Sequence, residues 1–233
     1  MILKWNTIQN GILHSVPCRW AFIQNPLTEE YSLELAKTYP QDKFEELTWE
    51  ENGFFWRKPI IVTPEDISKI RDLRKDLHQK IEQGYFCCVV QNLSESWQKF
   101  IKELQSLAYR EAMGELLDLN LKDHMIGISF RRYHPGHFGR SPHTDFQGGT
   151  TVTQLYFFNQ EWHLDWGGYF QILSDSKNES VVYKIPPRLN TSVAIVFSKN
   201  SWHMVTPVVP YAPYPRLTLA ITYWKPKWNP IPS

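Results

Sequence analysis

Residues 216–224 read RLTLAITYW, and they end the stretch of sequence that decides the fold. Apolar and polar side chains alternate along it, as expected of a strand whose successive side chains point to opposite faces. Six β-rich runs separated by turn residues are HMIGISFRRY (124–133), TTVTQLYFFN (150–159), GGYFQIL (167–173), SVVYKIP (180–186), TSVAIVF (191–197) and RLTLAITYW (216–224). Short strands that follow a helical half predict a mainly β fold, a sandwich or barrel, with flanking α-helices.

The half of the chain before these runs has helical spacing. Pro64, preceded by threonine and followed by two acids, predicts a helix start, and Gly84 predicts its end. A second helix is predicted to begin near Ser94 or Ser96 and to run to about Leu117. Its predicted apolar face is Trp97, Phe100, Ile101, Leu104 and Leu107. We interpret both helices as packing elements.

Composition sets limits on the partners. The chain has 233 residues, 42% of them hydrophobic, and 25 Lys+Arg against 24 Asp+Glu give a net charge of +1. This balance provides no basic surface for nucleic acid or for an anionic membrane. The sequence shows neither an apolar run of the ~18 residues that span a bilayer nor a secretory signal. We therefore predict a cytoplasmic protein with no nucleic-acid or membrane partner, and its oligomeric state stays open.

One domain is predicted, because no internal repeat, low-complexity tract or linker divides the chain. It would span residues 1–233, with helical support and extra strands in 1–123 and the strand-rich core in 124–226. Three cysteines are too few for a disulfide framework or a zinc knuckle.

A candidate metal site lies in the second half. His143 and Asp145 lie two residues apart in RSPHTDF, so in an extended chain both side chains point to the same face. His203, just after the run TSVAIVF, is the predicted third ligand. Two histidines and one carboxylate on one face of an octahedron leave three open positions, the arrangement of non-haem Fe(II) oxygenases.

The last run suggests a second element of the site. One of its faces is apolar and suits packing against helices, whereas the other carries Arg216 and Thr218. A guanidinium inside a barrel is costly unless it has a partner. A buried carboxylate of a ligand would be such a partner. The alternative is that Arg216 lies at the sheet edge and pairs with an acidic side chain.

The order of these motifs resembles that of the Fe(II)/2-oxoglutarate-dependent oxygenases, in their prolyl-hydroxylase-like branch. The similar elements are RRY, YHPGHFGRSPHTD, LYFFNQEW, DWGGYFQI, IPPRLNTSVAIVFSKNSWHMVTPV and RLTLAITYW. They cover roughly residues 124–226. The strand that ends in asparagine, followed by tryptophan and a glycine pair, is more specific than the His-x-Asp motif. The resemblance implies a double-stranded β-helix, or jelly-roll, with iron between its two sheets.

The resemblance also implies roles for individual residues. His143, Asp145 and His203 match the family's iron ligands. Arg216 matches the residue that binds the distal carboxylate of 2-oxoglutarate, and Thr218 its supporting hydroxyl. The implied cofactors are Fe(II), 2-oxoglutarate as co-substrate and O2, with ascorbate as a candidate stimulant.

Two further matches concern the same pocket. Tyr133 matches a tyrosine that lines the co-substrate site. Related halogenases have a small residue in place of the metal-binding carboxylate, so the presence of Asp145 favours hydroxylation over halogen transfer. One departure is predicted: alternation turns Thr153 and Phe157 inward and Tyr156 outward, so an inward tyrosine of this branch is missing.

Substrate contacts are predicted more loosely. Arg131 shares the inward alternation of Tyr133 and could meet an anionic substrate, although a surface ion pair is the alternative. Arg140 and Gln147 lie close to the metal motif, and Trp162 is a candidate whose alternative role is packing at the rim. His134 and His137 are competing metal ligands, disfavoured because neither has a carboxylate two residues on. Their positions do not identify a substrate.

The predicted function is hydroxylation of an unactivated C–H bond in a small molecule, such as a free amino acid or a natural-product intermediate. It would be coupled to decarboxylation of 2-oxoglutarate to succinate. The alternatives are a prolyl hydroxylase acting on a protein, a non-catalytic metal-binding jelly-roll, and a nucleic-acid demethylase, which the charge balance does not support.

Overall fold

The computed structural model describes residues 1–41, 44–48, 54–61, 88–137, 139, 141–146 and 150–225. For 45–48, 54–61, 88–89 and Gln91 only the backbone is described. The helix predicted between Pro64 and Gly84 lies outside these residues. Among the described residues, no helix has the length and apolar character needed to cross a membrane.

A large antiparallel sheet forms the centre of the molecule. Its strands are β1 (Ile12–His14), β2 (Trp20–Gln24), β3 (Glu45–Thr48), β4 (Phe54–Ile61), β6 (Met125–Tyr133), β7 (Thr150–Phe157), β10 (Thr191–Val196) and β12 (Arg216–Trp224). Their order is β1-β2-β10-β7-β12-β6-β4-β3, and the short β5 (Cys88–Val89) pairs in parallel with β4. The strands before the predicted core therefore widen the sheet at both edges.

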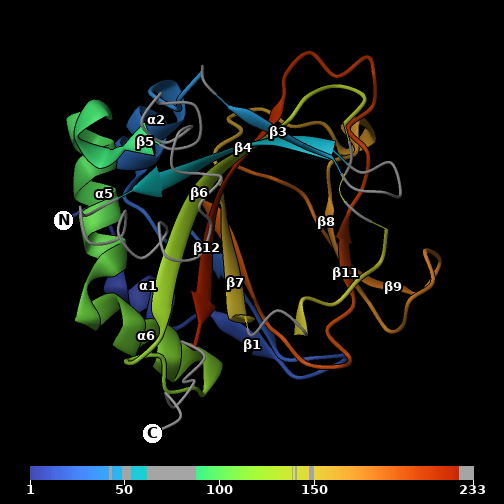
Figure 1. Ribbon diagram of the computed structural model, residues 1–233, viewed down its shortest axis with the longest axis horizontal. Coiled ribbons are helices and arrows are strands. Elements are labelled where there is room, and N and C mark those ends of the chain that lie inside the picture. Colours follow the sequence, from blue (N-terminus) through green and yellow to red (C-terminus); the bar gives the residue numbers. More distant parts are fainter. Residues whose placement is uncertain are drawn as a thin grey trace, which may run out of the picture.

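A small sheet lies opposite one face of the large one (Figure 1). It consists of β11 (His203–Val205), β8 (Phe170–Leu173) and β9 (Val181–Ile185), in that order. Leu155 and Phe157 of the large sheet share one apolar core with Phe170 and Ile172 of the small sheet. Two sheets packed around such a core confirm the predicted jelly-roll.

Four helices in the described part of the chain cover the other face of the large sheet (Figure 1). They are α1 (Trp5–Gln9), α2 (Glu29–Lys37), α5 (Glu95–Gln105) and α6 (Leu107–Leu117), and 3₁₀ turns lie at Val90–Asn92 and Leu164–Trp166. Trp97 and Phe100 of α5 share a buried cluster with Leu219, Ile221 and Tyr223 of β12. The predicted apolar face of β12 therefore packs against helices.

The single helix predicted up to Leu117 is wrong in one respect, since it is two helices. Ser106 ends α5 with an extended ψ of 152°, and its hydroxyl accepts a hydrogen bond from the Tyr109 N–H at the start of α6. Such a hydroxyl cap begins a new helix. Leu107 lies beyond this break and is 55% exposed, not part of the apolar face.

All six predicted runs form strands, β6, β7, β8, β9, β10 and β12. The short strand β11 was not predicted. It places His203 at its first residue, next to β8. The turn between β10 and β11 thus carries the chain from the large sheet to the small one.

Candidate active site

The two histidines of the predicted metal site are held together by their own backbones. His143 and His203 form an isolated antiparallel bridge. The His143 N–H donates to the His203 carbonyl at 3.1 Å, and the His203 N–H donates to the His143 carbonyl at 3.0 Å. The two imidazole centroids lie 4.3 Å apart. Strand β11 thus brings the third predicted ligand to the first.

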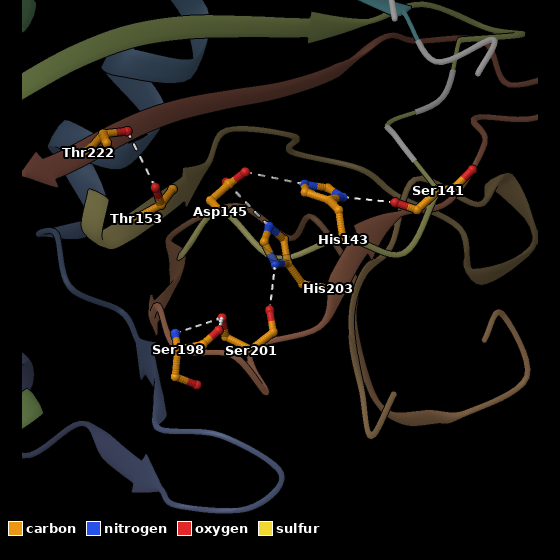
Figure 2. A network of polar contacts seen from close by, with 8 residues as sticks. All are labelled: Ser141, His143, Asp145, Thr153, Ser198, Ser201, His203 and Thr222. Carbon is orange, nitrogen blue, oxygen red and sulfur yellow. Dashed lines mark hydrogen bonds and ion pairs between the residues drawn. The ribbon is translucent and has the colours of Figure 1, made fainter. Parts of the chain in front are cut away.

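Both imidazoles point toward Asp145 (Figure 2). Nε2 of His143 lies 3.8 Å from Oδ1 of Asp145, and Nε2 of His203 lies 3.7 Å from Oδ2. One ligand atom from each residue lies within 4.8 Å of the other two. This cluster is the only group of three or more such side chains found in the part of the chain that the structure describes.

The far nitrogen of each imidazole contacts a backbone carbonyl. Nδ1 of His143 lies 2.8 Å from the Ser141 oxygen, and Nδ1 of His203 lies 2.9 Å from the Ser201 oxygen. A carbonyl only accepts, so each Nδ1 carries the proton and each Nε2 keeps its lone pair for a metal. The Ser201 hydroxyl bonds the Ser198 backbone in turn, which stiffens this turn (Figure 2).

The donor set therefore fits a divalent metal such as iron. Two neutral imidazoles and one carboxylate supply one face of an octahedron. Burial lowers the pKa of His203 to about 4, with the nearby His143 as the second cause. His203 is thus neutral at physiological pH, the form that binds metals.

Arg216 lies at the start of β12 and is only 1% exposed. Its Nε donates to the Gly168 carbonyl at 2.7 Å, and its Nη1 donates to the Thr218 hydroxyl at 2.7 Å. Among the described residues, its buried Nη2 has no hydrogen-bond partner. Burial lowers the pKa of the guanidinium to about 10, so it stays charged at neutral pH.

Among the described residues, no carboxylate pairs with Arg216, so the alternative of an ion pair at the sheet edge finds no support. A buried guanidinium with one unused nitrogen is costly unless a ligand completes it. The 2-oxoglutarate carboxylate implied by the sequence fits this role, because a carboxylate accepts from such a cation.

Aromatic rings surround the guanidinium. Tyr133 is the cross-strand partner of Arg216, and the guanidinium carbon lies 4.9 Å from its ring centroid. The same atom lies 5.2 Å from the ring centroid of Phe157. Both contacts are within cation–π range and help to offset the loss of hydration.

The predicted facing of Phe157 and Tyr156 is confirmed. Phe157 lies in the core between the sheets, whereas Tyr156 lies in the helix-side core. The Tyr156 hydroxyl bonds the Tyr109 hydroxyl at 2.6 Å. The ring beside Arg216 on this strand is therefore that of Phe157, which has no hydroxyl.

A glycine pair shapes the pocket next to Arg216. Gly167 and Gly168 have φ values of +70° and +66°. A Cβ on Gly167 would lie 2.0 Å from the Pro207 carbonyl oxygen, and the Gly168 N–H donates to the same oxygen at 2.9 Å. Sequence reasoning used this pair only as part of a motif and missed that Gly168 binds Arg216. The adjacent glycines were the available signal.

The predicted substrate residues fall into two groups. Arg131 is the cross-strand partner of Thr218 and is half-buried. Trp162 donates from Nε1 to the Gly167 carbonyl at 3.0 Å and packs on the apolar cluster that contains Tyr133. Arg140 and Gln147 lie outside the described residues.

The competing metal ligands do not join the cluster. The rings of His134 and His137 lie 5.2 Å apart, and neither residue belongs to the metal-binding group. The His137 carbonyl accepts from the Val208 N–H at 2.9 Å, which ties their turn to the Pro-rich loop.

Comparison with known proteins agrees with this geometry. Residues 128–224 match the model of the 2OG-Fe(II) oxygenase superfamily. The structure is similar to a Pseudomonas putida prolyl-4-hydroxylase, with a TM-score of 0.59, 17% identity, and coverage of 89% of this chain and 92% of that chain. No curated protein matches the chain.

Two further solved structures show the range of proteins with this fold. A prolyl hydroxylase from Trichoplax adhaerens, in complex with a hypoxia inducible factor peptide fragment, has a TM-score of 0.60 and 18% identity over 95% of this chain and 89% of that chain. The α-ketoglutarate-dependent epimerase SnoN from nogalamycin biosynthesis has a TM-score of 0.52 and 10% identity over 88% of this chain and 78% of that chain. These similarities show a shared fold.

Proposed function

We propose that this chain, whose residues 128–224 match the model of the 2OG-Fe(II) oxygenase superfamily, is such an oxygenase and hydroxylates an unactivated C–H bond of a small molecule. A free amino acid or a natural-product intermediate is the proposed substrate class. Bound Fe(II) and 2-oxoglutarate supply the oxidising chemistry, with O2 as oxidant and succinate as co-product. The observation that carries the proposal is the buried Arg216, with one unused nitrogen, on the jelly-roll that also holds the His143–Asp145–His203 cluster.

Each residue of the candidate site has a defined role in the proposed reaction. His143, Asp145 and His203 hold the metal on one face and leave the opposite face for ligands. Arg216 and Thr218 bind the distal carboxylate of 2-oxoglutarate. Tyr133 and Phe157 cover the guanidinium and exclude water, which strengthens its attraction for that carboxylate.

Arg131 supports a substrate with an anionic group. Arg131 lies two residues before Tyr133 in β6, so both side chains point to the same face, and Arg131 pairs with Thr218 across the sheet. Burial is the main cause of the lowered pKa of both His203 and Arg216, and the positive charge of Arg131 adds to the lowering in each case. A second guanidinium beside the co-substrate pocket suits a carboxylate such as that of a free amino acid.

Hydroxylation of a prolyl residue in a protein is the second candidate. Overall size does not separate the two, since the chain covers 92% and 89% of two prolyl hydroxylases. The same fold also occurs in SnoN, an epimerase from nogalamycin biosynthesis. A turnover assay is therefore needed to distinguish a small-molecule substrate from a prolyl residue in a protein.

Succinate release under O2 tests both candidates in one assay. One panel contains free amino acids and other small carboxylates, and the second contains proline-containing peptides. We expect release above the substrate-free background in the first panel and none with Asp145→Ala. Release only with peptides would replace the small-molecule proposal by the prolyl one.

Three further proposals concern domain organisation, location and partners. A single domain over residues 1–233, a cytoplasmic location and the absence of a nucleic-acid partner rest on the sequence pattern and the net charge of +1. A salt-sensitive shift of labelled DNA or RNA in a gel would contradict the last of these.

A further inference from the structure

Asn159 holds the backbone on both sides of Arg216. Its side chain is almost fully buried, with the residue 5% exposed. Nδ2 donates to the Pro215 carbonyl at 2.8 Å, and Oδ1 accepts from the Leu217 N–H at 2.8 Å. Arg216 is the one residue between these two contacts.

The carboxamide replaces a missing part of the strand ladder. The register pairs Phe157 with Thr218, so two residues further on Asn159 would lie opposite Arg216. The Phe158 N–H still donates to the Leu217 carbonyl at 3.2 Å, but the Leu217 N–H turns to Oδ1 of Asn159. The side chain thus continues the ladder where β7 leaves the sheet.

Asparagine suits this position because its side chain must both donate one hydrogen bond and accept another. Pro215 has no N–H and offers only a carbonyl, so its partner must donate. Leu217 offers an N–H, so its partner must accept. The backbone of Asn159 is fixed as well, since its carbonyl accepts from the Leu189 N–H at 2.8 Å. The Asn159 side chain, bonded to Pro215 and Leu217, therefore forms a rigid clamp around Arg216.

Arg216 reaches its ligand-binding position through this clamp. Gly168 and Thr218 fix the direction of the guanidinium, while Asn159 fixes the point from which the side chain starts. A displacement at that point would move Nη2, the nitrogen left for a carboxylate. From this juxtaposition we infer that Asn159 is a positioning residue for co-substrate binding, and the inference rests on the proposed function.

Calorimetric titration of the anaerobic Mn(II)-loaded protein with 2-oxoglutarate tests the inference without turnover. We expect Asn159→Ala to raise the Kd for 2-oxoglutarate about tenfold, with the Kd for Mn(II) unchanged. An unchanged Kd for 2-oxoglutarate in a folded Asn159→Ala protein would overturn the inference.

Asn190 provides the matched control. It makes the same pair of contacts, accepting from the Leu27 N–H at 2.9 Å and donating to the Leu27 carbonyl at 3.0 Å, away from Arg216. Its φ of +57° tolerates glycine, so Asn190→Gly removes both bonds without backbone strain. We expect it to lower the melting temperature and leave the Kd for 2-oxoglutarate unchanged. An equal rise in Kd in both variants would reduce Asn159 to a general stabilising role and overturn the inference.

A near-isosteric variant covers the case in which Asn159→Ala does not fold. Asn159→Asp keeps the acceptor for Leu217 and loses the donor to Pro215. We expect a higher Kd for 2-oxoglutarate, and wild-type affinity would overturn the inference. Failure of the unaltered protein to bind 2-oxoglutarate would instead contradict the proposed function.

Discussion

His143 and His203 exchange both backbone hydrogen bonds as an isolated two-residue bridge, and their imidazoles face the same carboxylate. The main chain therefore sets the positions of the two histidine ligands relative to each other. Preorganisation of this kind lowers the ordering cost of binding. The bridge also joins the segment after β6 to the small sheet, because His203 begins β11.

Arg216 gives the sharpest test of the co-substrate pocket. Arg216→Ala removes the cation beneath the pocket, so we expect the Kd for 2-oxoglutarate to rise roughly 100-fold while Mn(II) still binds. Calorimetric titration measures both constants. Arg188→Ala, which removes an exposed arginine, is the control and should bind like the unaltered protein. Unchanged 2-oxoglutarate affinity in Arg216→Ala would remove this residue from the pocket.

Gly167 is predicted to tolerate no side chain. Gly167→Ala places a Cβ 2.0 Å from the Pro207 carbonyl oxygen at a φ of +70°. Gly136→Ala has a similar backbone penalty at a φ of +87°, but no described residue beyond its chain neighbours has an atom within 4 Å of its Cβ. Urea unfolding should show Gly167→Ala to be less stable than Gly136→Ala by about 1–3 kcal/mol. Equal losses would mean that the loop moves aside without cost.

Tyr39 ties strands β6 and β12 together behind the pocket. Its buried hydroxyl accepts from the Arg131 N–H at 3.1 Å and lies 3.0 Å from the carbonyls of Arg131 and Thr218. Tyr39→Phe should lower the free energy of unfolding by about 1–3 kcal/mol, because these groups lose a buried partner. Tyr214→Phe removes an exposed hydroxyl and should change it by less than about 0.5 kcal/mol. Similar values for the two variants would contradict this role.

His134 should make stability depend on pH. Burial lowers its pKa to about 4, with the charges of Arg132 and His137 as further causes. In the unfolded chain its pKa is about 6.5, so between these values the unfolded state binds the extra proton. Stability should therefore fall as the pH drops from about 6.5 toward 4. In denaturant titrations of His134→Gln, the free energy of unfolding should fall less steeply with decreasing pH. His163→Gln changes an exposed position and should show the same pH dependence as the unaltered protein. A slope in His134→Gln equal to that of the unaltered protein would contradict the assignment.

The sequence predicts the core strands well, because each run is short, β-rich and bounded by turn residues, and alternation marks the two faces of the last run. Residues 216–224 show this directly: Leu219, Ile221 and Tyr223 pack against helices, and Arg216 and Thr218 face inward. The break at Ser106 was missed, since a single serine in a helical pattern also reads as an ordinary surface position. Local spacing carries no clear signal for a cap inside a long apolar stripe.

The sequence predicted the metal-binding residues of the candidate site, but not the residues that hold Arg216 in place. His143, Asp145 and His203 have side chains that only a few roles explain, and the structure brings them together. Asn159 and Gly168 act through backbone contacts made across long stretches of chain. Such contacts depend on tertiary structure, and the adjacent glycines marked only the place in the chain, not the contact with Arg216.

Anaerobic titration with Fe(II) and 2-oxoglutarate tests the central claim most directly. The unaltered protein should develop the weak visible charge-transfer band of the iron chelate. His143→Ala should not, because it lacks a ligand of the metal, whereas His163→Ala, changed at an exposed histidine, should. No band in the unaltered protein, while Zn(II) still binds tightly, would contradict the oxygenase account and leave a metal-binding jelly-roll.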